Sequence, residues 1–445
     1  MTVEADYDLV GVGIGPFNLG LAALTSDVAD LRTAFFDEHH EFSWHPGIMV
    51  DGATLQVPAL ADLVSLVHPT SRWSFVNYLH CHDRLYAYSF WGSGNPLRVE
   101  YDDYCHWVAR SLPSCRFESR VEAFCWDDDL AAFAIDVVCA DGRHEVVTSR
   151  HVVVGIGTEP VMPQAMSSGQ SRVFHSSDYI YRQADLASYR DISVVGSGQS
   201  GAEVFLDLLG RQPRHGWRLR WITRSPEFIP LAYSKLGLER FTPDYTRFFY
   251  SLQQDVKDRI LPGQWKRYNA IDDDTLAAIY NLLYERTAAG RSSNVELCPG
   301  HEVVSLTEDA DGCELTCRQV LQESDVLLRT DCVVAATGYK PRSPECMKPM
   351  IAKVELDSSD RFVVGLDHSL RLDAAVGGSV YVQNAEAHTH GLSAPDLGLG
   401  AYRNATIINA IVGRDVYRTP ERSAFTVFAP PSSQVALSGQ GTEAT

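Results

Sequence analysis

Residues 7–26 read YDLVGVGIGPFNLGLAALTS: a hydrophobic run, a glycine-rich turn and a second apolar segment. The spacing predicts a strand, a tight turn and a helix, the context in which a GxGxxG pattern binds a dinucleotide. Its glycines let the backbone approach a pyrophosphate; proline replaces the third glycine here, at a helix first turn that tolerates it. An ordinary strand–helix turn is the alternative. The predicted cofactor-binding residues of this loop are Gly11, Gly13, Gly15 and Pro16.

A second unit of the same kind lies in the middle of the chain, where residues 191–209 read DISVVGSGQSGAEVFLDLL. The strand expected after the first unit ends in Asp37, an acceptor for ribose hydroxyls, and the strand after the second ends in Arg224, a partner for a 2′-phosphate. Arg224 therefore favours NADPH over NADH, with a solvated surface arginine as the alternative. The predicted residues of this loop are Gly196, Ser197, Gly198, Gln199, Ser200 and Gly201.

Two such units predict an α/β fold with two Rossmann-like dinucleotide-binding domains, the second inserted in the first. The strand before Thr337 and the segment 388–413 are assigned to the first domain. Apolar residues at helical spacing, together with the acidic run Asp272–Asp274, predict a small helical segment beside the substrate. The expected division is 1–160 and 332–428 for the first domain, 161–239 for the second, 240–292 for the helical segment, 293–331 for a return between the domains, and 429–445 for a disordered tail.

The bulk composition narrows the class of protein. The 445 residues are 45% hydrophobic, enough for a large core, and their net charge of −19 argues against a nucleic-acid partner. The N-terminus lacks a secretory signal, and no apolar run reaches the roughly 18 residues that span a bilayer. Ten cysteines are scattered without a CxxC pair, so we expect reduced thiols, no metal site, and a cytoplasmic protein without membrane attachment.

Two dinucleotide sites in one chain suit a bound FAD that a diffusing NAD(P)H reduces. The small-residue turn at Thr337–Gly338 fits this arrangement because it lets the chain pass close to a cofactor. Flavoproteins of this kind pass electrons to a disulfide or to oxygen, and the lack of a CxxC pair removes the first class. Oxygen is therefore the expected acceptor. A flavin enzyme of another kind and a non-catalytic nucleotide-binding scaffold are the alternatives.

Several longer stretches go beyond these general patterns. They resemble the flavin-dependent N-hydroxylating monooxygenases, which include the lysine, ornithine and diamine N-monooxygenases of hydroxamate siderophore biosynthesis. The lysine and diamine branch looks closer than the ornithine branch, and the similarity runs from about Tyr7 to about Tyr417. The stretches are GVGIGPFNLGLAAL (11–24), FFDEHHEFSWHPGIM (35–49), LADLVSLVHPTSRWSFVNYL (60–79), VVGSGQSGAEVFLDLL (194–209), AATGY (335–339) and HTHGLS (388–393).

The resemblance implies an FAD- and NADPH-dependent enzyme that transfers an oxygen atom from O2 to a primary amine. The flavin supplies the oxygen chemistry, and the protein orients groups and excludes water. A homo-oligomer is also implied, a tetramer in relatives, and no residue is assigned as a proton-transfer catalyst. Trp44, His45 and Gln56 match family positions close to the flavin, with core packing as the alternative for Trp44 and His45. The other positions assigned to cofactors are Thr337, Gly338, Tyr339, Gly391 and Leu392.

The substrate prediction rests on two departures from the family pattern. In PALADL (58–63), Ala61 stands where the amino-acid hydroxylases carry a lysine that binds the substrate α-carboxylate. Gly398 stands at a place that serine often holds in the segment lining the pocket. A substrate without a carboxylate is therefore expected: a small diamine, with cadaverine ahead of putrescine. L-Lysine N6-hydroxylation is the leading alternative, followed by L-ornithine N5-hydroxylation.

Charged residues elsewhere bear on the same choice. A neighbouring cation would replace the missing lysine, and the candidates are Lys235, Arg240 and Arg267. A diamine needs a carboxylate partner for its distal ammonium. The candidates are Glu239, Glu386 and Asp396. Each of them also suits a surface or loop-capping role, so none is assigned to the site.

Overall fold

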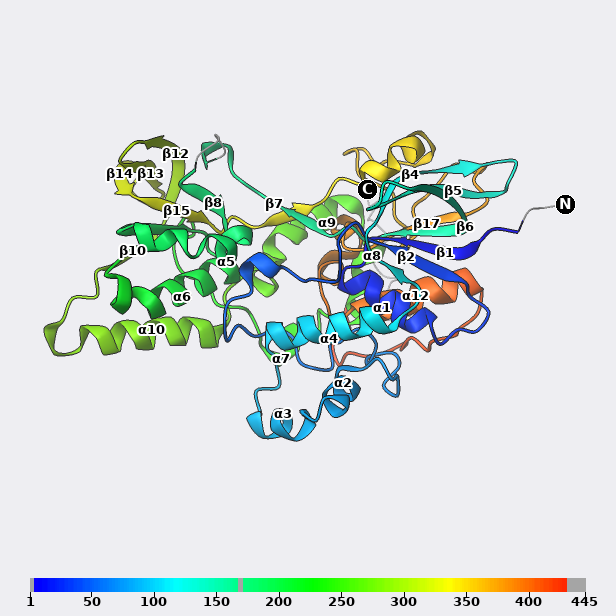
Figure 1. Ribbon diagram of the computed structural model, residues 1–445, viewed down its shortest axis with the longest axis horizontal. Coiled ribbons are helices and arrows are strands. Elements are labelled where there is room, and N and C mark those ends of the chain that lie inside the picture. The colour runs from blue at the N-terminus through cyan, green and yellow to red at the C-terminus, as the bar shows by residue number, and fades with distance from the viewer. Residues whose placement is uncertain (1–3, 167–170, 430–445) are drawn as a thin grey trace, which may run out of the picture.

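The computed structural model describes residues 4–166 and 171–429, which form two α/β halves at opposite ends of the long axis (Figure 1). The first half is built on a seven-stranded sheet, in which the strands paired with the N-terminal strand run parallel to it. Its order is β3 (Cys115–Arg116), β2 (Thr33–Phe36), β1 (Tyr7–Val12), β6 (His144–Val154), β5 (Ala132–Cys139) and β4 (Ser119–Asp127), with β17 (Ser379–Val382) also paired to β6.

Side chains that alternate along the strands give this sheet two apolar faces. Leu9 of β1 belongs to the buried cluster under the helices, whereas its neighbour Val10 belongs to the cluster on the other face. The second face is closed by β4, β5 and the 3-10 segment η7 (Glu345–Lys353). The helices over the first face are α1 (Pro16–Thr25), α2 (Phe75–Cys81), α4 (Arg98–Ser111) and α12 (Gly400–Val412).

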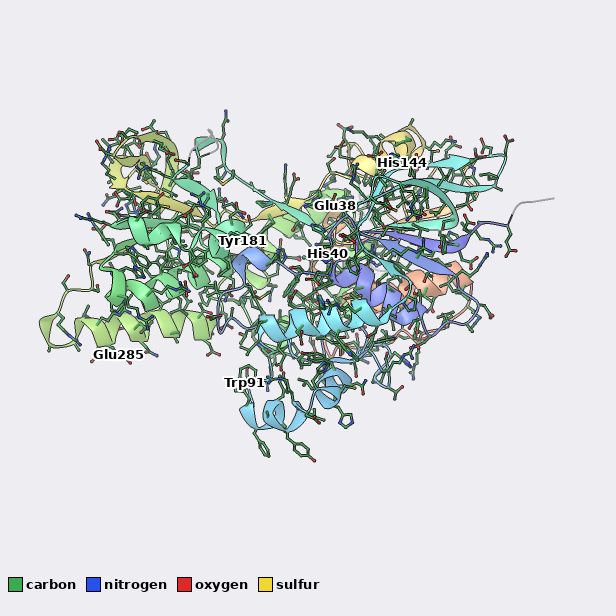
Figure 2. All side chains as sticks on the ribbon, in the orientation of Figure 1. Glu38, His40, Trp91, His144, Tyr181 and Glu285 are labelled. Carbon is green, nitrogen blue, oxygen red and sulfur yellow. The ribbon has the colours of Figure 1, made fainter. Side chains whose placement is uncertain are left out.

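The second half is built on a five-stranded parallel sheet between a helical layer and a small antiparallel sheet. On one face, α6 (Gln199–His215) packs against α10 (Asp273–Thr287), whose Glu285 points away from the body of the molecule (Figure 2). The other face carries β12 (His301–Asp309), β13 (Gly312–Gln319) and β14 (Ser324–Thr330). The order of the central sheet is β11 (Val295–Pro299), β10 (Arg218–Thr223), β9 (Asp191–Val195), β15 (Cys332–Ala335) and β8 (Val173–His175).

The assignment of the strand before Thr337 to the first domain is wrong. β15 runs parallel between β9 and β8, with Val333 opposite Ser193 of β9. All four of its residues are buried, and a fully apolar strand indicates a sheet centre without indicating which sheet. The halves are joined by an antiparallel ribbon of β7 (Thr158–Pro160) and β16 (Tyr339–Pro341), and the chain rejoins the first sheet at β17. One dinucleotide unit is thus inserted in the other, as predicted, but β15 belongs to the inserted unit.

Helices form where the periodicity predicts them, but they divide between the halves. α8 (Pro243–Ser251) and α9 (Gln254–Ile260) pack against α11 (Ala387–His390), whereas α10 lies on α6. Asp272 caps α10, because its carboxylate accepts hydrogen bonds from the backbone N–H groups of Asp274 and Thr275. The predicted helical segment is therefore not a single body beside the substrate. The tail predicted to be disordered lies, from residue 430 onward, outside the described residues.

Short elements complete the two halves and the connections between them. Within the described ranges, no helix is long and apolar enough to cross a membrane. The remaining elements are α3 (Leu85–Trp91), α5 (Tyr179–Arg182), α7 (Lys235–Leu238), η1 (Pro46–Ile48), η2 (Gln164–Met166), η3 (Ser176–Asp178), η4 (Asp185–Ser188), η5 (Leu261–Arg267), η6 (Ala288–Gly290) and η8 (Gly391–Ser393).

Gly378, just before β17, tests the packing of the first sheet. A Cβ there would lie 2.3 Å from the carbonyl oxygen of Arg150 and 2.7 Å from the ring of Phe133. We expect Gly378→Ala to cost about 1–3 kcal/mol by overpacking and to lower the melting temperature in a scan at fixed rate. Gly210→Ala is the matched control, because no atom lies within 4 Å of its Cβ position in α6, and alanine is favoured there by about 0.5–1 kcal/mol. Equal melting temperatures for the two variants would contradict this packing.

Candidate active site

A cavity of about 670 Å³ lies between the two halves of the molecule. Its lining includes Thr158, which follows β6 of the first sheet, and Ser200, which follows β9 of the second. Ligands of open α/β folds bind at such carboxyl ends of parallel strands. The cavity brings together seven residues predicted from the sequence: Trp44, His45, Gln56, Ala61, Ser200, Tyr339 and Gly398.

The first glycine loop forms an open cradle before α1. Gly13 has φ of +85°, and a Cβ there would lie 2.7 Å from the carbonyl oxygen that follows β6. Nothing lies within 4 Å of the Cβ position at Gly15, and Pro16 opens the helix, so the N-terminus of α1 is free to receive a phosphate. Gly11 has a packing reason to be glycine, because a Cβ there would lie 2.0 Å from the ring of Phe35.

Asp37 follows β2 and orients the first loop. Its Oδ2 accepts a hydrogen bond from the backbone N–H of Ile14 at 2.7 Å, and its Oδ1 accepts one from the backbone N–H of His39 at 2.9 Å. Burial raises the pKa of Asp37, but the hydrogen bonds with His39 and Ile14 outweigh burial and hold the pKa below its usual value. Glu38 and His40 follow it near the middle of Figure 2, where the halves meet. A contact between Asp37 and a ribose stays a prediction.

The second glycine loop brings α6 close to the end of its strand. A Cβ at Gly196 would lie 2.1 Å from the carbonyl oxygen of Ala336, and one at Gly201 would lie 3.0 Å from the carbonyl oxygen of Gly196. Gly198 is the N-cap residue of α6. The close strand–helix approach expected from the three glycines is therefore present, and it leaves the N-terminus of α6 at the cavity wall with Ser200.

The remaining residues predicted for the second nucleotide differ in what they contact. The Gln199 amide is engaged by the protein, since it accepts from the backbone N–H of Asp272 and donates to the hydroxyl of Thr275. Arg224 follows β10, is exposed, and makes no hydrogen bond or ion pair with any other described residue. Its guanidinium is thus available at the carboxyl edge of the sheet. Cofactor contacts of Ser197 and Gln199 stay predictions.

Three residues predicted to lie near the flavin share one wall of the cavity. Gln56 Nε2 is buried without a hydrogen-bond partner among the described residues, a donor that a cofactor acceptor atom would satisfy. The ring centroids of Trp44 and His45 lie 5.4 Å apart, and His45 meets Tyr339 edge-on at 5.5 Å. Burial and the charge of Arg98 lower the pKa of His45 to about 4, so its imidazole is neutral at physiological pH.

Of the other two groups of predicted cofactor residues, only Tyr339 lines the cavity. Of residues 337–339, Tyr339 lines the cavity, whereas Thr337 donates to a backbone carbonyl and Gly338 accepts from the His175 ring at 3.1 Å. Leu392 is buried against α8, and a Cβ at Gly391 would lie 3.0 Å from the ring of Phe249 in that helix. Cofactor contacts at these positions stay predictions. Residues 395–398, a few positions further along the chain, line the cavity.

The two positions behind the substrate prediction are neighbours in space. A Cβ at Gly398 would lie 3.3 Å from Cβ of Ala61 and 3.0 Å from Oδ1 of Asp396. Burial raises the pKa of Asp396 to about 6, although the backbone N–H of Leu399 and the charge of Arg403 act in the opposite direction. The charged group at this end of the cavity is therefore a carboxylate, and a methyl group stands where the related amino-acid hydroxylases are expected to carry a cation.

The other charged candidates separate clearly. Arg267 lines the cavity. Arg240 donates to the hydroxyl of Tyr245, and Lys235 is exposed. Two of the carboxylate candidates do not line the cavity. Glu239 accepts hydrogen bonds from the backbone N–H groups of Phe425 and Thr426, and Glu386 is buried against Arg403.

Arg98 and Tyr233 are among the cavity residues that sequence reasoning missed. Arg98 lines the cavity and is the first residue of α4. A positive charge is unfavourable at the N-terminus of a helix because the helix dipole is positive there. This unfavourable position could have indicated, from the sequence, that Arg98 has a distant partner. That partner is Glu203, with Nη1 and Oε2 2.9 Å apart. Tyr233 donates its hydroxyl to the carbonyl oxygen of Gln56, and nothing in the sequence around it signals this contact.

The donors, open cradles and small residues fit two dinucleotides. The first loop with Asp37 and the unpaired Nε2 of Gln56 would suit one dinucleotide, and the N-terminus of α6 with Arg224 would suit the other. Among the described residues, no cluster of histidine, cysteine, aspartate and glutamate side chains is arranged to hold a metal ion.

Comparisons with known proteins agree with this geometry. The chain is 37% identical over 435 residues to the putrescine N-hydroxylase of Acinetobacter baumannii, covering 98% of this chain and 96% of that one. The crystal structure of DfoA bound to FAD, the cadaverine monooxygenase of desferrioxamine biosynthesis from Erwinia amylovora, matches with a TM-score of 0.92 and 37% identity over 96% of this chain and all of that chain. An ornithine N-hydroxylase from Kutzneria sp. 744, with reduced FAD, NADP⁺ and L-ornithine, matches with a TM-score of 0.85 and 29% identity over 92% and 99%.

A family model described as L-lysine 6-monooxygenase/L-ornithine 5-monooxygenase matches residues 5–341. This match covers both glycine loops and the ribbon between the halves. It confirms the resemblance seen in the sequence, and the chain belongs to the L-lysine 6-monooxygenase/L-ornithine 5-monooxygenase family.

Proposed function

We propose that this enzyme uses FAD, NADPH and O2 to hydroxylate one primary amine of a small diamine, cadaverine or putrescine, for hydroxamate siderophore biosynthesis. One observation carries the choice of substrate: the cavity presents the Asp396 carboxylate beside Ala61 and Gly398. A carboxylate favours an ammonium and disfavours the carboxylate of an amino acid. The inferred setting is a cytoplasmic homo-oligomer, and light scattering after size exclusion measures its assembly.

The residues divide into three roles in this proposal. When bound, FAD would supply the chemistry with O2, and NADPH would supply the reducing equivalents. The first loop and Gln56 hold the flavin nucleotide, and the second loop with Arg224 holds NADPH. The apolar lining excludes water, and Asp396 orients the diamine by its distal ammonium. With a pKa of about 4, His45 serves as a neutral wall and not as a proton donor.

L-Lysine is the second candidate substrate because Arg267 also lines the cavity. A guanidinium is a suitable partner for the α-carboxylate that Ala61 cannot bind. The pKa of Asp396 is affected by the charge of the buried Arg403. A direct comparison of substrates distinguishes selection by the Asp396 carboxylate from selection by the Arg267 guanidinium.

The first prediction concerns substrate choice. We expect hydroxylamine product from cadaverine and putrescine, and a kcat/KM at least about 100-fold lower with L-lysine and L-ornithine, because an unpaired buried carboxylate costs about 3 kcal/mol or more. The purified enzyme is incubated with NADPH, O2 and one amine at a time, and hydroxylamine is quantified together with NADPH consumption. Product from L-lysine alone would overturn the diamine proposal, and Arg267→Ala would then be expected to abolish it.

The second prediction concerns Asp396. Asp396→Asn keeps the oxygen that accepts from Leu399 but removes the charge, so we expect kcat/KM for the diamine to fall roughly 30-fold or more, mainly through KM. Because the pKa of Asp396 is raised to about 6, protonation removes the charge as the pH falls through 6. The wild-type profile should therefore steepen below about pH 6, and the variant profile should not. Glu239→Gln, outside the cavity, is the control; matching profiles in the wild type and Asp396→Asn would exclude this role.

The third prediction concerns the choice of nicotinamide cofactor. Arg224→Ala should raise the KM for NADPH about 10- to 100-fold and leave the KM for NADH nearly unchanged, since a charge-assisted hydrogen bond contributes about 1.5–3 kcal/mol. Steady-state kinetics with each cofactor measures the ratio. Arg214→Ala, an exposed arginine in the last turn of α6, is the control. An unchanged preference in Arg224→Ala would assign the 2′-phosphate to another residue.

A further inference from the structure

A buried ion pair crosses the boundary between the two halves. Arg98 opens α4, which covers the first sheet, and Glu203 lies in α6, which covers the second. Nη1 of Arg98 and Oε2 of Glu203 are 2.9 Å apart, with side-chain exposures of 16% and 5%. In Figure 1, α4 extends from the first half toward the second.

Local helix energetics explains neither partner of the pair. Glu203 is the fifth residue of α6, beyond the first turn in which the helix dipole favours a negative charge. Arg98 lies at the N-terminus of α4, where the dipole disfavours a positive charge. Its backbone N–H is fixed by the carbonyl oxygen of Ala53, so the side chain starts from a defined place at the cavity rim. The position of Arg98 is therefore explained by its partner in the other half.

The two charges lie within ion-pair distance of each other only when the halves are in this orientation. Burial raises the pKa of Glu203, and the charge of Arg98 is the largest opposing influence. If the halves rotated apart, a largely buried carboxylate would lose its counter-ion. Buried pairs contribute little net stability but strongly penalise arrangements that separate them. The pair therefore selects one relative orientation of the halves.

The pair is also connected to both predicted cofactor sites. Oε1 of Glu203 accepts a hydrogen bond from Nε2 of Gln199 at 2.8 Å, and Gln199 is the first residue of α6 after the second glycine loop. On the other side, Arg98 lines the cavity together with His45 and Gln56. The chain crosses between the halves in the short two-stranded ribbon of β7 and β16, and again on either side of α8 and α9. Side-chain contacts such as this pair add to these connections in setting the orientation.

We propose that the Arg98–Glu203 pair is a latch that sets the orientation of the nicotinamide-binding half against the flavin-binding half. The two residues are positioning residues: they act through the relative placement of two cofactors and not on the reacting atoms. The inference rests on the proposed use of FAD and NADPH but not on the identity of the amine. Hydride transfer requires close approach of the two rings, so a small rotation of one half slows it.

The test compares Glu203→Gln with Asp207→Asn, one turn further along α6. Asp207 pairs with Arg211 and accepts from Tyr179, both within the second half. We expect Glu203→Gln to slow anaerobic flavin reduction at saturating NADPH about 10- to 100-fold, with Asp207→Asn within about twofold of wild type. No amine is present. A wild-type enzyme that NADPH does not reduce would therefore refute the proposed function, whereas equal rates in wild type and Glu203→Gln would refute the latch alone.

A structural readout separates orientation from chemistry. In the absence of nucleotide, Glu203→Gln should be cleaved faster by a protease at the inter-domain ribbon and should show a larger radius of gyration by small-angle X-ray scattering than Asp207→Asn. Slower reduction with unchanged cleavage and radius would overturn the latch. The double variant Arg98→Gln/Glu203→Gln should be no slower than the worse single variant, because both changes break one interaction. Effects that multiply would show that the residues act separately.

Discussion

A glutamate and an arginine, both closed off from water, fix the wall of the cavity. Nε of Arg403 lies 3.4 Å from Oε1 of Glu386, and Nη2 donates to the carbonyls of Ser393 and Ala394 at 2.8 and 2.7 Å. The guanidinium also lies 4.4 Å from the ring centroid of Phe17, in the helix after the first glycine loop. Burial raises the pKa of Glu386, but Arg403 and a neighbouring histidine outweigh it and lower the pKa to about 2. Because neither charge has water to return to, α1, α12 and residues 395–398 keep fixed relative positions.

The sequence specified the parts of the structure in which a local pattern has a local cause. Gly13 and Gly196 are needed because the backbone itself comes too close for a side chain, and a spacing of glycines reveals this directly. The sheet to which the strand at 332–335 belongs could not be predicted in this way, because a strand buried on both faces is compatible with either sheet. Which sheet receives such a strand depends on long-range pairing, and only the parallel register with β9 and β8 decides it.

The candidate site shows the same limit in its charged residues. Ala61 and Gly398 were identified through the resemblance, and the fold brings them into contact distance. Asp396 looks in the sequence like an ordinary turn residue, and its raised pKa arises from enclosure by segments distant in the chain. Arg98 is the opposite case, because its place in the first turn of α4 breaks a local rule and gains a cause only from Glu203 in the other half. A residue that violates the local preference of its helix or strand is therefore evidence for a distant interaction, whereas a residue that satisfies this preference does not reveal one.

A diamine has two identical ends, and the proposed cavity treats them differently. Asp396 stabilises an ammonium at one end, while much of the remaining lining is apolar, with side chains such as Leu55, Val57 and Phe241. Apolar surroundings disfavour the charged form of an amine and lower its pKa. The end away from Asp396 is therefore driven toward the neutral form, whose lone pair N-hydroxylation requires. No second carboxylate lines the described cavity, and His45 is already neutral, so the reacting amine would release its proton to water as it enters the apolar part of the cavity. The asymmetry that selects the substrate is thus also the asymmetry that prepares it for reaction.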